Sequence, residues 1–293
     1  MTWYQGLKGK IRVSVPLKGY TTFKIGGPVK YFIEPKDIDD LRFILGLLKK
    51  KKLPFLVIGC GSNILASDAG LNCAVIKLSA PYFSKISIKG NFLEAGSGVL
   101  LGRLVFFCRE KGLSGIESLA GIPGTLGGAL VMNAGAWGMN ISSAVDSVTV
   151  LDNKLKVKTL SKKSIKFGYR KSGLSKYIIL SAHLRVIKEN KRAIHGRVEE
   201  VMRLRRQSQD LSYPSAGCIF RNPPADSSGR LIEECGLKGA KIGGASVSLK
   251  HANFIINLNR ANAGDVLKLI NFVKKKVKSK FNINLKPEIK IWG

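Results

Sequence analysis

Two glycine-rich segments of this sequence have the composition of sites that bind phosphate groups. The first, residues 59–63 (GCGSN), directly follows an apolar run at residues 53–58. Glycines let the backbone approach a phosphate closely, and successive N–H groups can form an anion-binding nest. The spacing does not match the GxGxxG fingerprint, so it does not predict a Rossmann-type nicotinamide site. An ordinary tight turn is the alternative interpretation.

The second segment, residues 121–129 (GIPGTLGGA), lies inside a stretch without charged residues at positions 118–145. Together with Thr125 and Asn133, its backbone groups can bind the pyrophosphate of a large flat cofactor. Close packing of turns in a core is the alternative. The stretch is long enough to span a bilayer, but its six glycines and Pro123 would break a membrane helix. We therefore expect no membrane insertion.

A series of short motifs runs along the chain in the order TTFKIGG (21–27), GCGSNIL (59–65), GIE (115–117), GIPGTLGG (121–128), YRKS (169–172), PSAGCIFRNP (214–223), GRLIE (229–233), KHANFIIN (250–257) and Glu288. This series resembles the family of UDP-N-acetylenolpyruvoylglucosamine reductases, the flavoenzymes of bacterial peptidoglycan precursor synthesis. The resemblance implies an α+β fold. Two subdomains would form an FAD-binding fold of the vanillyl-alcohol-oxidase type, followed by a C-terminal α+β substrate domain.

The resemblance also implies a reaction. NADPH would reduce bound FAD, and the flavin would pass hydride to the enolpyruvyl double bond of UDP-N-acetylglucosamine enolpyruvate, giving UDP-N-acetylmuramate. We expect noncovalent FAD, because none of the three histidines lies in the loop at residues 59–68. The residues expected to bind FAD are Gly59, Cys60, Gly61, Ser62, Asn63, Gly121, Ile122, Pro123, Gly124, Thr125, Gly128 and Asn133.

Three residues match catalytic positions of the family. Arg170 would pair with the substrate carboxylate, where a planar fork of donors can hold two oxygens as negative charge builds. Glu288 would assist the enolate or its proton delivery. Cys218 stands where the family usually has a serine that protonates the enol intermediate; a thiol with a pKa of about 8.5 can also do so. Without the resemblance, Arg170 and Glu288 are solvated charges and Cys218 is a small buried hydrophobic residue.

The substrate-binding residues implied by the resemblance are Asn222, with Arg221 and Arg230 as neighbours of the diphosphate. Residues 208–210 (SQD) depart from the family, which commonly has Lys or Thr, Gln and Pro there. The segment at residues 184–199 is too short for the tyrosine-bearing insertion of longer members, so the chain resembles the shorter class. The histidines are too few and too scattered for a metal site.

The elements that must position these residues can be predicted from hydrophobic periodicity. Residues 31–34 favour a strand, and Asp37 is a plausible N-cap for a helix from Ile38. The run at residues 53–58 predicts a buried strand. The further predicted strands lie at 74–78, 86–88, 92–95, 148–151, 177–180 and 285–291, and the further helices at 101–111, 191–206 and 263–281.

The predicted domains follow from these elements and from the resemblance. Residues 1–68 would form the first FAD-binding subdomain and residues 69–188 the second. Residues 189–283 would form the substrate domain. The final strand, at residues 284–293, would return to the first subdomain.

The net charge of +30 (49 Lys and Arg against 19 Asp and Glu among 293 residues) suggests a nucleic-acid partner. The distribution weakens that idea, because lysines lie along the whole chain and no stacking aromatics are interleaved with them. A non-catalytic nucleic-acid-binding protein remains an alternative, as does another oxidoreductase of the same flavin fold with a different acceptor. The start of the chain lacks an apolar signal region and the five cysteines are scattered, so we expect a cytoplasmic protein. We also expect a monomer.

Overall fold

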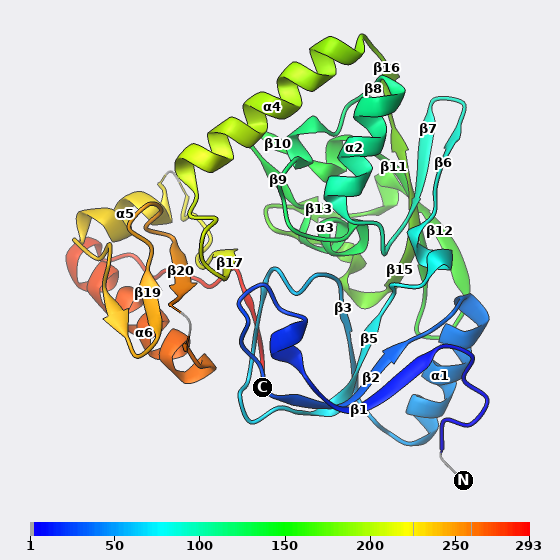
Figure 1. Cartoon of the computed structure of the whole chain (residues 1–293), viewed down its shortest axis with the longest axis horizontal. Coiled ribbons are helices and arrows are strands. Elements are labelled where there is room, and N and C mark those ends of the chain that lie inside the picture. Colours follow the sequence, from blue (N-terminus) through cyan, green and yellow to red (C-terminus); the bar gives the residue numbers. More distant parts are fainter. Residues whose placement is uncertain (1–2, 225, 259) are drawn as a thin grey trace. The chain divides into compact units, whose positions relative to one another are not determined.

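The computed structural model describes residues 3–224, 226–258 and 260–293, and the chain folds into two compact units (Figure 1). Unit 1 comprises Met1–Arg12, Tyr31–Gly59 and Cys73–Leu204. Unit 2 comprises Val13–Lys30, Cys60–Asn72 and Arg205–Gly293. Each unit is built from segments that are distant in the sequence. The division into domains at residues 68, 188 and 283 stays a prediction.

Unit 1 is centred on a five-stranded antiparallel sheet in the order β12-β11-β15-β7-β6. Its strands are β6 (Ile86–Lys89), β7 (Phe92–Gly96), β11 (Val145–Leu151), β12 (Val157–Ser161) and β15 (Ile178–Arg185). Helices α2 (Leu101–Lys111) and α3 (Leu126–Met132) share one hydrophobic core with this sheet. The predicted helix at residues 101–111 is confirmed at both ends, because its apolar positions recur at helical spacing and Gly112 terminates it in the left-handed conformation.

Helix α1 (Ile38–Lys50) begins as predicted. The Asp37 side chain accepts a hydrogen bond from the Asp40 N–H, as an N-cap does. The apolar face is buried together with Ile33, Ala74 and Ile76. Its buried side chains are Leu41, Ile44, Leu45 and Leu48.

A four-stranded sheet has the order β1-β2-β5-β3, with β3 and β5 parallel. Its strands are β1 (Lys10–Pro16), β2 (Pro28–Glu34), β5 (Leu71–Lys77) and β3 (Phe55–Ile58). The prediction of a buried strand at residues 53–58 is wrong, since Phe55 is 39% exposed and Val57 41% exposed. The reason is that β3 is an edge strand of this sheet, and its alternate side chains point to a face that is not covered.

Unit 2 contains a sheet in the order β17-β20-β19-β18 and the long helix α6 (Ala263–Phe281). The strands are β17 (Ser215–Cys218), β18 (Lys241–Ile242), β19 (Ala245–Val247) and β20 (Phe254–Asn257), and a short helix α5 (Ser228–Glu234) also belongs here. Helix α6 has the predicted bounds and begins with a capping box between Asn262 and Asp265. Its buried face, which includes Val266 and Val273, packs in the core of the unit.

The C-terminal strand is shorter than predicted. Instead of residues 285–291, β21 covers Lys290–Trp292 and pairs in parallel with β4 (Ile64–Ala66). Pro287 lacks an N–H group and makes only an isolated bridge to Phe220, so regular pairing does not extend through it.

The remaining elements are short, apart from α4 (Lys191–Ser208), which agrees with the helix predicted at 191–206. The two-stranded pairs are β8 (Leu113–Ser114) with β16 (Ile187–Lys188), β9 (Gly135–Ala136) with β10 (Met139–Asn140), and β13 (Phe167–Gly168) with β14 (Lys171–Ser172). Among the described residues, none of the helices is long and apolar enough to cross a membrane.

The carboxylate of Asp40 organises the N-terminal part of unit 1. It accepts backbone hydrogen bonds from Lys8, Gly9 and Lys36, each at 2.8 Å, and the side chain is buried. We expect Asp40→Ala to lower the free energy of unfolding by about 3 kcal/mol, because three partly buried hydrogen bonds to a charged acceptor are lost. Denaturant unfolding of this variant and of the wild type measures the difference.

The matched control is Asp39→Ala, on the same helix turn. Asp39 is 83% exposed in its side chain and forms an ion pair with Arg42 at 3.2 Å. We expect this change to alter the free energy of unfolding by less than about 1 kcal/mol. Equal destabilisation by the two changes would contradict the role of the Asp40 carboxylate.

Candidate functional site

The glycine-rich segment of unit 1 presents unused backbone donors. Among the described residues, the N–H groups of Gly121, Gly124 and Thr125 donate to no acceptor. The chain on either side is fixed, since the Leu126 N–H donates to the Val99 carbonyl at 2.8 Å. A fixed backbone with unused N–H groups fits an anionic group such as a pyrophosphate.

Gly59 and Thr125, both predicted to bind a cofactor, lie against each other in unit 1. A Cβ atom on Gly59 would come within 2.5 Å of the Thr125 Oγ1. That hydroxyl caps α3 by accepting a hydrogen bond from the Gly128 N–H at 3.3 Å. The glycine at the end of β3 therefore leaves the room in which Thr125 forms the cap.

Ser97 is a candidate ligand-binding residue that the sequence analysis missed. Its Oγ is buried and has no hydrogen-bond partner among the described residues, while its carbonyl accepts the Gly127 N–H at 2.8 Å. A buried hydroxyl without a partner beside the glycine-rich segment fits a ligand that supplies the missing hydrogen bond. Its position after β7 gives no signal in the sequence.

Unit 2 contains the rest of the first glycine-rich segment. Gly61 has a φ of 63°, and a Cβ atom there would lie 2.2 Å from the Tyr20 carbonyl oxygen, so only glycine fits. The Gly61 carbonyl accepts the Thr22 N–H at 3.3 Å. Within the described parts of the chain, the N–H groups of Gly61 and Ser62 have no acceptor. These groups have the same anion-binding chemistry as those of unit 1, and Asn63 next to them donates to the Glu288 carbonyl at 3.4 Å.

Arg170 occupies the turn of the hairpin formed by β13 and β14 in unit 1. Its φ is 52°, which is unusual for a residue other than glycine. The guanidinium donates from Nη1 to the Gly135 carbonyl at 2.9 Å and lies 5.4 Å from the centroid of the Tyr169 ring. The arginine is therefore held in a defined direction instead of lying loosely on the surface.

Asn133 is the C-cap of α3 and is 4% exposed. Its Nδ2 donates to the Gly168 carbonyl at 3.1 Å, and its Oδ1 accepts from the Ser142 N–H at 3.3 Å. The residue that was predicted to contact the cofactor thus makes side-chain contacts with the hairpin of Arg170. The sequence offered no signal for this partner, which lies 35 positions further along the chain.

Cys218 and Glu288 lie on neighbouring segments of unit 2. The Glu288 N–H donates to the carbonyl of Ile219, the residue after Cys218, at 2.7 Å. Cys218 is the last residue of β17, paired with Phe254, and both Cys218 and Glu288 are partly buried. The structure therefore places these two predicted catalytic residues on neighbouring backbone segments.

The predicted substrate-binding residues of unit 2 differ in their surroundings. The Arg221 Nε is buried and has no hydrogen-bond partner among the described residues. The Asn222 Oδ1 accepts the Ser228 N–H at 3.1 Å. Arg230 is exposed and forms ion pairs with Asp226 and Glu234; its hydrogen bond holds the pKa of Asp226 below the ordinary value. An orphaned buried donor suits an anionic ligand better than a guanidinium whose charge is already compensated.

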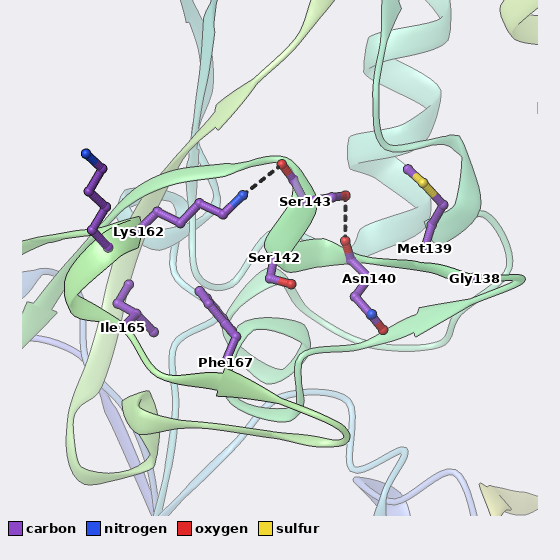
Figure 2. Close-up of a pocket in the computed structure, with 9 residues that line it drawn as sticks. Gly138, Met139, Asn140, Ser142, Ser143, Lys162, Ile165 and Phe167 are labelled. Carbon is purple, nitrogen blue, oxygen red and sulfur yellow. Dashed lines mark hydrogen bonds between the residues drawn. The ribbon is translucent and has the colours of Figure 1, made fainter. Parts of the chain in front are cut away.

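The pocket drawn in Figure 2 belongs to unit 1 and has a volume of 490 Å³. Ser142, Ser143, Lys162 and Phe167 are among its lining residues, and Lys162 donates to the Ser143 carbonyl at 3.3 Å. None of the predicted site residues lines this pocket. It therefore lies outside the predicted site, although Ser142 also bonds to Asn133.

Comparison with known proteins gives matches along the whole chain. Residues 29–161 match the family described as "FAD binding domain", and residues 209–292 match "UDP-N-acetylenolpyruvoylglucosamine reductase, C-terminal domain". UDP-N-acetylenolpyruvoylglucosamine reductase of Clostridium novyi is 40% identical over 98% of this chain and 93% of its own length. The same-named protein of Caldanaerobacter subterraneus is 42% identical, over 98% and 95%. The crystal structure of the Thermus caldophilus reductase superposes with a TM-score of 0.84 at 36% identity, covering 98% of this chain and 99% of that one.

We expect Gly59→Ala to raise the dissociation constant for FAD by about tenfold. The added methyl group would overlap the Thr125 hydroxyl, so the cap of α3 and the adjoining backbone donors would shift. Titration of the apoprotein with FAD, followed by flavin fluorescence, measures the constant.

Gly46→Ala, on α1, is the control, because a Cβ atom there meets nothing within 4 Å. This variant should bind FAD like the wild type. Wild-type affinity in Gly59→Ala would show that the contact with Thr125 does not matter for the cofactor.

Proposed function

Because this chain belongs to the UDP-N-acetylenolpyruvoylglucosamine reductase family, we propose that it reduces UDP-N-acetylglucosamine enolpyruvate to UDP-N-acetylmuramate with NADPH as hydride donor. The chain is an FAD-dependent oxidoreductase of peptidoglycan precursor synthesis. The observation that carries the proposal is the agreement with the relatives over nearly the whole chain, FAD-binding part and C-terminal part alike. We further propose that the protein acts in the cytoplasm as a monomer.

Bound FAD would supply the hydride chemistry, receiving hydride from NADPH and passing it to the alkene. The chain's own contribution begins with binding. The unused N–H groups of Gly121, Gly124 and Thr125 in unit 1 support a phosphate-binding role for the second glycine-rich segment. Those of Gly61 and Ser62 in unit 2 support the same role for the first segment. None of the three histidines lies in the loop at residues 59–68, so we expect noncovalent FAD that leaves on denaturation.

Arg170 would bind the carboxylate of the substrate. A guanidinium presents five N–H donors in a planar fork, which matches the two oxygens of a carboxylate. Negative charge grows on those oxygens as the alkene accepts hydride, so the arginine binds the transition state more strongly than the ground state. The bond from its Nη1 to the Gly135 carbonyl supports this role, because it fixes the direction of the fork.

Cys218 would hold the proton that completes the lactyl ether, and Glu288 would assist the enolate or the proton delivery. A thiol is protonated at neutral pH and is a stronger acid than the serine hydroxyl usual in the family. The backbone contact between Glu288 and Ile219 supports an arrangement in which the two groups act on one substrate. Asn222 and Arg221 would contact the substrate, with Arg230 as a more distant neighbour.

The proposed reaction is tested by an anaerobic titration of the holoenzyme. We expect NADPH to bleach the visible flavin band, and addition of UDP-N-acetylglucosamine enolpyruvate to restore it, because the substrate removes the hydride. Flavin that is bleached but not restored would point to a different acceptor on the same fold. Retention of the protein on nucleic acid without stoichiometric flavin would favour the non-catalytic alternative.

The role of Cys218 is tested by comparing two substitutions. We expect Cys218→Ser to keep substantial turnover, because a hydroxyl can donate the proton. Cys218→Ala should slow the reoxidation of flavin by the UDP-sugar by at least about a hundredfold, and the reduction by NADPH far less. Stopped-flow absorbance of the flavin gives both rates, and equal losses in the two half-reactions would exclude proton donation by Cys218.

A further inference from the structure

We propose that Asn133 is a positioning residue that holds Arg170 in its working orientation by fastening the β13–β14 hairpin to the end of α3. The catalytic consequence of this inference rests on the proposed function, whereas the fastening itself does not. All residues involved belong to unit 1. This role differs from the direct contact between Asn133 and the cofactor that the sequence suggests.

Three hydrogen bonds connect the hairpin to residues 131–135, which comprise the end of α3 and the residues directly after it. Asn133 Nδ2 donates to the Gly168 carbonyl at 3.1 Å, immediately before the turn. The Ser172 Oγ donates to the Val131 carbonyl at 3.0 Å, after the turn, and the guanidinium of Arg170 donates to Gly135 between them. The chain is therefore hydrogen-bonded on both sides of Arg170, and the guanidinium of Arg170 is itself hydrogen-bonded.

The amide of Asn133 is suited to this task because both of its ends are engaged. While Nδ2 bonds to the hairpin, Oδ1 accepts from the Ser142 N–H on the far side, so the amide bridges two chain segments. The side chain is 4% exposed, and removing it would leave the Gly168 carbonyl and the Ser142 N–H without this partner in the interior. Such a bridge is costly to break and leaves little room for motion.

The hairpin turn needs external support. Arg170 has a φ of 52°, in the left-handed region that is strained for a residue with a side chain. A strained conformation persists only when neighbouring contacts fix it. The bonds at Gly168 and Ser172 flank the strained residue directly, so loss of one of them would let the turn relax and would redirect the arginine.

The variant Asn133→Gly separates the effect of the side-chain amide from that of the backbone cap. Asn133 itself has a φ of 43° as the left-handed C-cap of α3, and glycine adopts this conformation without strain. The change therefore removes the side-chain bonds and keeps the backbone cap, which Asn133→Ala would not do.

Asn282→Gly is the matched control. Asn282 is the left-handed C-cap of α6 in unit 2, with a φ of 58°, and its exposed side chain accepts a hydrogen bond from Lys278 at 2.7 Å. The control repeats the same chemical change at the same helical position, away from the hairpin. It should leave flavin content and both half-reactions unchanged.

The first measurement is hydrogen–deuterium exchange of the holoenzyme. In Asn133→Gly we expect the amides of residues 167–173 to exchange about tenfold faster, while the amides of α2 keep their wild-type rates. Unchanged exchange in the hairpin would overturn the proposal, whatever the activity of the variant, because the hairpin would not depend on the amide.

The second measurement compares the half-reactions and a double mutant. In Asn133→Gly we expect reoxidation of reduced flavin by the UDP-sugar to slow about tenfold, with flavin content and reduction by NADPH unchanged. In an Arg170→Ala background the same change should slow reoxidation no further, because its effect passes through the arginine. An undiminished effect in that background would overturn the proposal.

The two proposals fail in different ways. If the UDP-sugar does not reoxidise the wild-type enzyme, the proposed function is wrong, and the exchange experiment still decides whether Asn133 fastens the hairpin. If the wild type is reoxidised and Asn133→Gly behaves like Asn282→Gly in both measurements, the proposed function stands and the positioning role falls.

Discussion

The missing side chain at Gly59 is the constraint on which much of unit 1 depends. It leaves space for the Thr125 hydroxyl, which would otherwise lie 2.5 Å from a Cβ atom. Thr125 in turn caps α3, and the other end of α3 is the residue that fastens the hairpin of Arg170. Because α3 has only seven residues, its first and last turns are adjacent. The segment with phosphate-binding chemistry and the arginine are thus connected through one short helix.

Unit 2 has a comparable link centred on Thr22. The Thr22 hydroxyl donates to the Ser215 carbonyl at 2.6 Å, at the start of the strand that ends in Cys218, while its N–H donates to the Gly61 carbonyl. These two hydrogen bonds explain physically why the motif at residues 21–27 matters to the fold, which the resemblance alone did not explain. A residue without any reacting group connects the glycine-rich loop of this unit with the strand of the proposed proton donor.

Sequence reasoning succeeded where the deciding interactions are local. The bounds of α2 and α6 and the cap of α1 follow from apolar spacing, a glycine or asparagine terminus and a capping side chain, all within a few residues. It failed for the burial of β3 and for the length of β21, because an edge position and a proline bridge depend on partners from elsewhere in the chain. In the candidate site, too, local features could be predicted and tertiary contacts could not. Glycines at residues 59–61 and 121–128 were visible as a pattern, whereas Ser97, Thr22 and the partner of Asn133 are set by tertiary contacts.

The excess of positive charge does not by itself identify the residues that meet an anionic substrate. Charges on the surface are screened within about 8 Å at physiological salt, so position and local pairing decide which cations matter. Arg230 already faces two carboxylates, which offset its charge before any ligand arrives. Arg221 stands in the same motif-rich part of unit 2, but its buried Nε lacks a hydrogen-bond partner among the described residues. A diphosphate bound there would satisfy a donor that the fold leaves open, while at Arg230 it would have to compete with Asp226 and Glu234. The structure therefore favours Arg221 over Arg230 as the contact to the diphosphate, a distinction that the sequence motifs alone could not make.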